Sequence, residues 1–576
     1  MAVKLSAGAM TVLERRYLKK DESRKVVETP EDMFARVAQN IAEVEKLYDK
    51  KADVGSLREK FHSMMSNLDF LPNSPTLMNA GRRLQQLAAC FVLPVADSLE
   101  SIFEAVKETA IIHQSGGGTG FSFSRLRPAD DIVGSTGGVA SGPVSFMRVF
   151  NATTEAIKQG GTRRGANMGV LKVDHPDIID FITVKEDPRE FVNFNLSVAV
   201  TDEFMEAVSS GGDYPLINPR TGHAVGRKKA SEVFDLIVES AWKSGEPGVL
   251  FIDRINGANP TPNIGVFDAT NPCGEQPLLA YEPCNLGSIN LGHMVKREGK
   301  GRSLDHDRLE EAVRLSIRFL DNVIDASRYP TASIDAMAKG NRKIGLGVMG
   351  FADLLVRLRT AYGSEESFSF ADKLMESISR TAWDESRRLA ALKGPFPNIK
   401  GSVFDKPGVT PVRNATTTTV APTGTLSIIA RCSSGIEPFF SLSYTRQVLN
   451  GVKIPEVNPL VEEVSREEGF YSPELVEYVS GGGDIKTRKD VPGEMKRIFS
   501  TAFDIPTEAH IRMQAEFQRH TDNAVSKTIN LPPEARAEDV KKAYLLAYRL
   551  RCKGVTVYRS GTRAEQVLTC KSPLYC

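Results

Sequence analysis

Residues 271–291 read NPCGEQPLLAYEPCNLGSINL, and the rest of the chain is best interpreted outward from this stretch. Asn271, Cys273 and Glu275 alternate along it, and alternate side chains lie on the same side of an extended backbone. The spacing therefore predicts that an amide, a thiol and a carboxylate converge on one small volume. A proline and a glycine separate them, a pair that favours a tight loop over a sheet interior. An isolated cysteine is usually a core residue, and it is the convergence that favours chemistry here.

The composition is that of an ordinary globular enzyme. The chain has 576 residues, of which 41% are hydrophobic and 25% charged, enough for one large domain with accessory parts. The 73 lysines and arginines balance the 72 aspartates and glutamates, which argues against a protein that coats nucleic acid or membranes. No segment has the length and apolarity of a signal peptide or a membrane span. The seven cysteines are scattered and form no CxxC pair, so we expect a cytoplasmic protein without a structural metal site.

Residues 1–85 are predicted to form a small helical N-terminal domain. Thr29 has the side chain of a helix cap, and Pro30 suits the first turn that follows it. Apolar residues then recur at helical spacing, which predicts two packing faces. The first face consists of Met33, Val37, Ile41, Val44 and Leu47, and the second of Leu57, Phe61, Met64 and Leu68.

From about residue 170 to 560 the chain alternates short β-rich runs with amphipathic helices, the pattern of an α/β domain. One long helix is predicted from the apolar stripe of Leu309, Val313, Ile317, Leu320 and Ile324. Cys90 lies in an apolar run, LAACFVL (87–93), and on its own would be interpreted as a core residue. The glycines of residues 345–350 match G-x-G-x-x-G but follow no convincing strand, so we interpret them as close-packing or turn positions. In TTTTVAPTGTLSII (416–429), a β-branched run precedes a turn whose hydroxyls and amides suit a phosphate group.

Two further segments are ambiguous when taken alone. KQGGTRRGAN (158–167) is a glycine-flanked basic loop, and most such loops are solvated surface. TCKSPLYC (569–576) carries two thiols, which indicates either a frayed end with accidental cysteines or a shuttle that reduces a buried disulfide by exchange. We favour the shuttle.

The segments NPCGEQPL and CNLGSINL resemble the finger loop of ribonucleotide reductases. They are most similar to the finger loop of the class that depends on adenosylcobalamin (vitamin B12). The resemblance extends from about residue 8 to the end of the chain. It implies a ten-stranded α/β barrel with a central finger loop over residues 86–560, and a mobile redox tail over 561–576. It also implies that ribonucleotides, expected to be diphosphates, are converted to 2′-deoxyribonucleotides for DNA synthesis by thiyl-radical chemistry.

The resemblance further implies a role for each residue that matches a family motif. Cys273 would become the thiyl radical, Glu275 the general base, and Asn271 the residue that orients the ribose. Cys90 and Cys284 would be the active-site dithiol, which the shuttle cysteines Cys570 and Cys576 reduce again. The substrate would lie against Ser74, Ala89, Gly117, Thr423, Gly424, Thr425 and Leu426. A deoxynucleoside triphosphate or ATP effector, which selects the substrate, would lie against Asp97, Ser98, Leu99, Arg127, Val133, Lys158, Gln159 and Arg163. A thioredoxin-like reductant and a second copy of the chain are the expected protein partners.

Two other functions stay open at this point. The large subunit of a diiron or dimanganese reductase would need adjacent tyrosines near its end, whereas Tyr558 is followed here by Arg559. A non-catalytic nucleotide sensor would not need Cys273 and Glu275, both of which are present. No D-x-H-x-x-G motif occurs, so the sequence does not indicate a histidine-ligated cobalamin.

Overall fold

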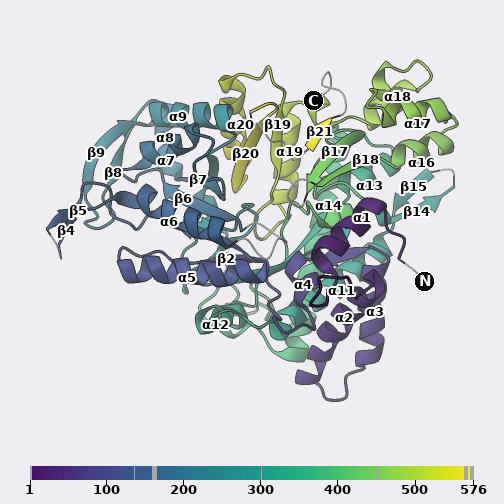
Figure 1. The fold of residues 1–576 in the computed structure, drawn as a ribbon, viewed down its shortest axis with the longest axis horizontal. Coiled ribbons are helices and arrows are strands. Elements are labelled where there is room, and N and C mark those ends of the chain that lie inside the picture. The colour runs from purple at the N-terminus through teal and green to yellow at the C-terminus, as the bar shows by residue number, and fades with distance from the viewer. Residues whose placement is uncertain are drawn as a thin grey trace.

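The computed structural model describes residues 3–134, 137–157, 165–299, 301–448, 452–562 and 568–570. Its N-terminal part is helical, as predicted, and lies at the lower right of Figure 1. Thr29 begins the second helix by accepting the N–H of Asp32, whose carboxylate accepts the N–H of Thr29 in return. The helices of this part are α1 (Ala7–Val12), α2 (Pro30–Ala42), α3 (Val54–Ser66) and α4 (Ser74–Asn79).

The predicted packing faces are buried except at one position. Met33, Val37 and Ile41 have no exposed surface, whereas Leu47 is 71% exposed. The prediction for Leu47 was wrong because the α-helix ends at Ala42 and a tighter 3-10 turn follows, which changes the direction of later side chains.

The predicted α/β barrel is confirmed, and it is built from two halves. In each half the strands are parallel, and the halves meet antiparallel where β2 pairs with β13 and where β10 pairs with β20. The first half consists of β2 (Cys90–Val92), β3 (Gly118–Ser122), β6 (Asn167–Lys172), β7 (Phe194–Val200) and β10 (Gly248–Phe251). The second consists of β13 (Pro283–Asn290), β16 (Ile344–Met349), the extended segment 416–420, β19 (Thr528–Leu531) with the residues that lead into it, and β20 (Gly554–Arg559).

Segment 416–420 closes the ring. It bridges to β16 at Leu346–Thr418 and to the approach of β19 at Val420–Val525, both in the parallel sense. The glycines of the GxGxxG run permit this contact, because a Cβ on Gly347 would come within 2.4 Å of the carbonyl oxygen of Thr419. Gly345 and Gly347 are therefore close-packing positions within β16, a strand that no local pattern had predicted, whereas Gly350, with a φ of 72°, lies at the turn into the next helix.

Helices cover the outside of the ring, and smaller sheets extend it (Figure 1). The predicted stripe of α11, which runs from Leu309 to Ile324, is buried against the barrel and against α14. The main helices are α5 (Leu99–Ser115), α6 (Gly142–Ala156), α7 (Ile178–Thr183), α8 (Asp202–Ser210), α9 (Ala230–Ser244), α10 (Ile252–Gly257), α11 (His306–Ala326), α12 (Ala332–Asn341), α13 (Phe351–Arg357), α14 (Glu365–Lys393), α15 (Leu426–Ala430), α16 (Leu460–Glu467), α17 (Pro473–Ser480), α18 (Gly493–Ile498), α19 (Thr507–Gln518) and α20 (Ala537–Arg549). The smaller strands are β1 (Phe70–Pro72), β4 (Ile132–Val133), β5 (Gly138–Val139), β8 (Asp213–Ile217), β9 (Ala224–Lys229), β14 (Val295–Glu298), β15 (Gly301–Leu304), β17 (Ser443–Val448), β18 (Val452–Val457) and β21 (Leu568–Cys570).

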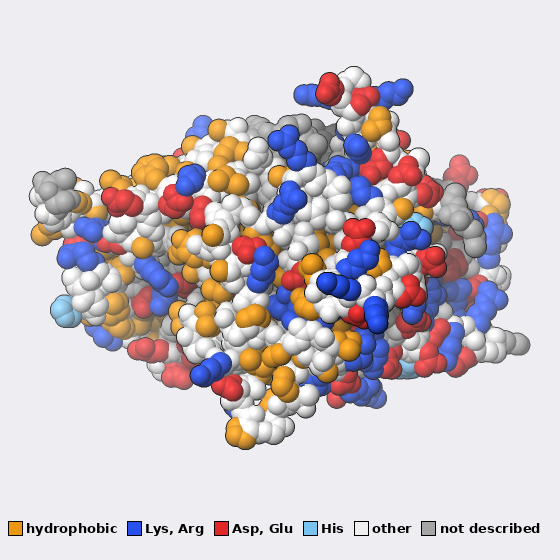
Figure 2. Space-filling view, turned by 90° about the horizontal axis from the view of Figure 1, so that it is seen from below, with side chains coloured by type: hydrophobic (Ala, Val, Ile, Leu, Met, Phe, Trp, Pro, Cys, Tyr) orange, Lys and Arg blue, Asp and Glu red, His pale blue; other side chains and the backbone are white. Residues whose placement is uncertain are grey.

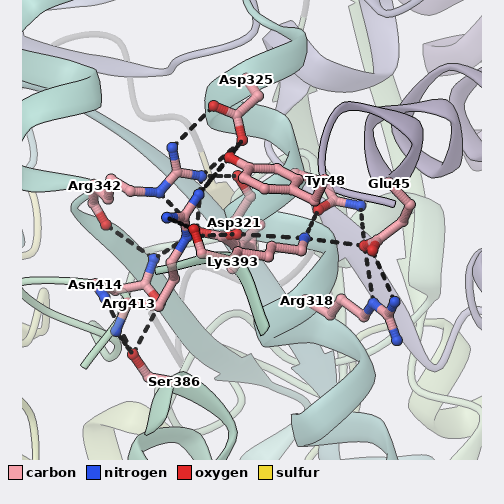
Figure 3. A network of polar contacts seen from close by, with 12 residues as sticks. Glu45, Tyr48, Arg318, Asp321, Asp325, Arg342, Ser386, Lys393, Arg413 and Asn414 are labelled. Carbon is pink, nitrogen blue, oxygen red and sulfur yellow. Dashed lines mark hydrogen bonds and ion pairs between the residues drawn. The ribbon is translucent and has the colours of Figure 1, made fainter. Parts of the chain in front are cut away.

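A buried polar network joins the N-terminal helices to the barrel domain (Figure 3). Its centre is Asp321 on α11, which is completely buried and pairs with Arg342 at 2.8 Å. Lys393 links this centre to Glu45 of the helical part, at 3.0 Å. Because a buried charge is stable only when it is paired, the network fixes how the two parts meet. No helix in the described parts of the chain is long and apolar enough to cross a membrane.

Candidate active site

The stretch that contains Asn271, Cys273 and Glu275 forms a hairpin inside the barrel. Strand β11 (Ala269–Thr270) pairs antiparallel with β12 (Pro277–Leu278), and residues 271–276 form the tip. The hairpin lies so close to the wall that a Cβ on Gly120 of β3 would come within 1.8 Å of the carbonyl oxygen of Thr270. Only glycine fits at that position, so the hairpin can pack against β3 because residue 120 has no side chain.

The tip is a turn rather than the extended backbone that the alternating residues predicted. Asn271 N–H donates to the carbonyl of Gln276, Gly274 N–H donates to the carbonyl of Asn271, and Gly274 has a φ of 82°. The three side chains differ in exposure. Cys273 is exposed, whereas Asn271 and Glu275 are each only 2% exposed. The prediction of an extended backbone was therefore wrong, because Gly274 turns the chain. The predicted convergence still holds, since Asn271 donates to Cys90 and the charges of Glu275 and Cys273 both act on it.

Three neighbouring strands hold the tip by its backbone. Asn195 of β7 donates its amide to the carbonyl of Pro272 at 2.7 Å. The carbonyl of Glu275 accepts both the hydroxyl of Thr419 and the N–H of Ala524, each at 2.9 Å. The backbone of the tip is thus fixed from both halves of the barrel.

Cys90 and Cys284 face each other directly across β2 and β13. Both are buried free thiols, and the amide of Asn271 donates to the sulfur of Cys90 at 3.2 Å. Residues directly opposite in an antiparallel pair have Cβ atoms about 4.5–5.5 Å apart, close to the spacing that a disulfide needs. The two thiols are therefore placed to be oxidised together.

The thiols of this pair resist ionisation. Burial raises the pKa of Cys90 well above its usual value, and the charge of Glu275 raises it further. Burial also raises the pKa of Cys284, an effect that the positive charge of Lys343 opposes. These electrostatic effects require that Glu275 and the two thiols lie near one another, as the sequence predicted. A protonated Cys90 can donate a proton to a neighbouring group.

Cys273 opens into a cavity of about 430 Å³ on the other side of the tip. Its wall includes strands β7, β10 and β20, the approach to β19, and the tip itself. Polar groups face the cavity beside several glycines, where a ligand can approach the backbone closely. Those residues include Asn195, Ser197, Gly248, Gln514, Asn530 and Gly554.

The predicted phosphate turn precedes α15, and the structure adds a cation to it. Thr423 has a φ of 53°, and its hydroxyl accepts the N–H of Gly435 at 2.8 Å. Arg16, from the N-terminal helical part, donates to the hydroxyl of Thr425 at 3.3 Å. Arg16 could not be predicted as a member of this site, because no pattern around it in the sequence indicates a contact with a residue as distant as Thr425.

The other predicted substrate residues have the following places. Ser74 is the first residue of α4, and its hydroxyl lies 2.7 Å from that of Tyr17. Ala89 donates its N–H to the carbonyl of Cys284, and Gly117 packs against Phe91. Gly424 and Leu426 belong to the phosphate turn and to the start of α15.

The structure brings the predicted effector residues together at one end of α5. Ser98 caps this helix, Leu99 begins it with 60% of its surface exposed, and Val133 lies in β4. Arg127 pairs with Asp97 at 2.8 Å. Lys158, Gln159 and Arg163 lie outside the described residues.

Of the two cysteines predicted to act as a redox shuttle, the structure describes one. Cys570 belongs to β21, which pairs with β17, and Cys576 lies outside the described residues. Tyr558 lines the cavity beside Cys273. Arg559 stacks its guanidinium over the ring of Trp242 at 4.4 Å and donates to two carbonyl oxygens, so it serves packing.

The chain belongs to the ribonucleotide reductase family. The family models described as "Ribonucleotide reductase, all-alpha domain" and "Ribonucleotide reductase, barrel domain" match residues 3–85 and residues 88–410 and 408–558. The class Id ribonucleotide reductase alpha subunit of Actinobacillus ureae shares the fold, with a TM-score of 0.78 over 97% of both chains and 22% identity.

Among sequence relatives, the chain is similar to proteins that carry a more particular name. A protein from Thermoplasma acidophilum called vitamin B12-dependent ribonucleoside-diphosphate reductase is 49% identical, over 98% of this chain and 80% of its own. A protein of the same name from Mycobacterium tuberculosis is also 49% identical, over 99% of this chain and 82% of its own.

Proposed function

We propose that this chain is an adenosylcobalamin-dependent ribonucleotide reductase that converts ribonucleoside diphosphates to 2′-deoxyribonucleotides. One observation carries the proposal: inside a closed barrel, Cys273 stands on a rigid turn beside a buried carboxylate and a pair of free thiols. The names of relatives that are 49% identical over nearly the whole chain support the cofactor and the diphosphate substrate.

The residues of the site divide the reaction among them. Cys273, as a thiyl radical, takes the hydrogen atom from C3′ of the ribose, and Glu275 takes the proton of the 3′-hydroxyl. Cys90 donates a proton to the 2′-hydroxyl, which leaves as water. Cys90 and Cys284 then supply two electrons and become a disulfide. Burial of the hairpin inside the barrel serves this chemistry because it keeps water and other reactants away from a radical.

The cavity beside Cys273 suits the nucleoside part of the cofactor implied by the relatives. Its volume of about 430 Å³ is that of a small-molecule site, and Cys273 forms part of its wall. Ser197, Gln514 and Asn530 would hold the polar groups of a nucleoside there, and the neighbouring glycines would let it approach the backbone. Adenosylcobalamin, when bound, would supply the radical chemistry that removes a hydrogen atom from the thiol of Cys273.

The turn before α15 would hold the substrate phosphates. Thr423, Gly424, Thr425 and Leu426 present hydroxyls and backbone amides, and Arg16 adds a positive charge next to Thr425. Charge-assisted hydrogen bonds of this kind are about twice as strong as neutral ones. Ser74, Ala89 and Gly117 would complete the substrate site on the side of Cys90.

The effector would bind at the end of α5 where Asp97 and Arg127 meet. From there, a chain of contacts leads to the finger: a Cβ on Gly165 would touch His113 of α5, and a Cβ on Gly118 would touch Pro272. The basic loop at 158–164 lies between these parts in the sequence. Arg163→Ala should therefore weaken the dependence of substrate choice on the effector, which assays of all four ribonucleotides under each effector would measure.

A second copy of the chain would cover the apolar side of α5. Leu99, Phe103 and Ile111 of this helix are 60%, 51% and 38% exposed, an unusual set for one helix. Hydrophobic side chains gather on the face seen in Figure 2, on the side where Figure 1 places α5. A homodimer through this helix would place both effector sites near the interface.

The deciding experiment is an anaerobic assay of the pure chain with ribonucleoside diphosphates, a dithiol reductant, and adenosylcobalamin either present or absent. Deoxynucleotide formed only with the cofactor supports the proposal. Activity that needs a second, metal-containing subunit would favour the diiron or dimanganese alternative, and no consumption of labelled nucleotide under any condition would favour a sensor.

A further inference from the structure

A buried ion pair lies directly behind the dithiol, and the reaction described above does not use it. Lys343 and Glu282 are each only 1% exposed at their side chains, and the lysine nitrogen lies 2.9 Å from a carboxylate oxygen. Charged pairs are rarely buried this completely, because removing both ions from water is costly. The burial of this pair at this place therefore needs a structural or functional explanation.

The sheet register places both charged residues beside Cys284. Glu282 lies two positions before Cys284, directly ahead of β13, and its charge acts on that thiol. β13 and β16 are parallel, and Asn285 lies opposite Ile344. The preceding residues of the two chains, Cys284 and Lys343, are therefore also neighbours. The thiol of Cys284 lies 3.7 Å from the carbonyl oxygen of Lys343.

The pair is held rigidly. The ammonium group of Lys343 also donates to the carbonyl of Pro277 at 3.1 Å and lies 4.3 Å from the centre of the Phe267 ring. The carboxylate of Glu282 accepts the N–H of Leu279 at 2.9 Å and the amide of Asn341 at 2.6 Å. The lysine thus lies at the base of the finger hairpin, where β12 begins.

The two thiols experience different charges. Burial raises the pKa of Cys284, and among the charges that act on it Lys343 has the largest effect and opposes the rise, while Glu282 and Glu275 add to it. Burial also raises the pKa of Cys90, but there the leading charge is that of Glu275, which adds to the rise. A negative charge is therefore accommodated better on Cys284 than on Cys90.

We propose that Lys343, oriented by Glu282, is a positioning residue that makes Cys284 the leaving thiolate when the Cys90–Cys284 disulfide is reduced. This role rests on the proposed function, since it assumes that the two cysteines cycle between dithiol and disulfide. A thiolate of an external dithiol attacks the sulfur of Cys90, the Cys90–Cys284 bond breaks, and its electron pair goes to the sulfur of Cys284. The second thiol of the reductant, after losing its proton, displaces Cys90 and closes a disulfide in the reductant. Cys90 and Cys284 each take up a proton, so two electrons and two protons reach the protein.

The test follows disulfide reduction alone, without nucleotide or cobalamin, so it is independent of whether the chain reduces ribonucleotides. The full-length chain is oxidised with diamide, and the Cys90–Cys284 bond is verified by peptide mass. Excess dithiothreitol is then added between pH 6 and pH 9, and the reaction is quenched with an alkylating label that reports both cysteines. A cation within about 4–6 Å shifts a thiol pKa by about 1–3 units. With a Brønsted coefficient near 0.5, Lys343→Met should slow reduction by about 3- to 30-fold.

Three further variants separate this role from simple packing. Glu282→Gln keeps the shape but leaves the cation unopposed, so it should reduce at least as fast as wild type. The double variant Lys343→Met with Glu282→Gln leaves no unpaired buried charge, and should be as slow as Lys343→Met. Lys393→Met removes an equally buried lysine whose partners are Glu45 and Asp321, and should leave the rate unchanged.

A monothiol probe identifies the sulfur that is attacked. Cysteamine should form its mixed disulfide with Cys90 in the wild-type chain. A mixed disulfide on Cys284, a wild-type rate in both variants that lack Lys343, or a Glu282→Gln variant as slow as Lys343→Met would each overturn the proposal. If Lys343→Met does not fold, the double variant and Glu282→Gln still decide it.

Discussion

Replacing Glu275 with glutamine tests the chemistry at the finger tip without disturbing its shape. Two contacts that fix this residue, from Thr419 and Ala524, go to its backbone carbonyl. Glutamine has the same length, so the turn should persist. A general base typically contributes 10²- to 10⁴-fold to a rate, so kcat should fall by that factor, equivalent to about 3–5 kcal/mol in the barrier.

The same variant has a second consequence that does not depend on turnover. The charge of Glu275 is, after burial, the leading cause of the raised pKa of Cys90. Its removal should lower that pKa, so the Cys90 thiol should react faster with an alkylating agent at a fixed pH. Glu385→Gln removes a glutamate that is just as buried, on α14, and should change neither quantity. A Glu275→Gln variant with wild-type kcat and unchanged Cys90 alkylation would refute the reasoning.

Three further predictions address the radical, the substrate and the fold. Cys273→Ser should abolish deoxynucleotide formation and leave nucleotide binding intact, because an O–H bond is too strong to exchange; any measurable product would contradict this role. Arg16→Gln should raise the KM for the diphosphate about tenfold or more with little change in kcat, as expected for loss of one charge-assisted hydrogen bond; an unchanged KM would remove Arg16 from the phosphate site. Although burial raises the pKa of Asp321, Arg342, Lys393 and Arg413 outweigh it and hold that pKa at about 2. The resulting stability is present above the unfolded pKa of about 4 and lost as pH falls toward 2, so Asp321→Asn should cost about 2–5 kcal/mol at pH 7 and progressively less near pH 2 in urea unfolding.

Most of the fold and most of the residues of the site could be predicted from the sequence. Helical periodicity predicted α2, α3 and α11, because their apolar stripes are long and regular. Segment 416–420 was correctly interpreted as extended, but its role in closing the barrel depends on pairing with residues near 346 and 525, which no local pattern encodes. Arg16 and Lys343 were missed for the same reason: each acts on a residue that is distant in the sequence.

The failed prediction of an extended backbone at the finger tip is the most informative about the mechanism. An extended finger would have aimed Asn271, Cys273 and Glu275 at the same point. In the turn, Cys273 lines the cavity and the other two residues are buried, while all three act on Cys90.

This division matters because the site has two incompatible tasks. In the proposed reaction, Cys273 takes up the radical character that a bound cofactor supplies, whereas the carboxylate and the dithiol handle protons and electron pairs in a dry volume. A turn fixed through its backbone carbonyls lets the sulfur of Cys273 face the cavity while it remains electrostatically coupled to Cys90. Gly274 makes that geometry accessible, since its φ of 82° is unfavourable for any residue with a Cβ. Gly274→Ala should therefore impair turnover although nothing lies within 4 Å of the added methyl group, because the loss comes from the backbone and not from a clash. If this variant turns over at the wild-type rate, the division of the finger tip into two faces does not depend on the turn.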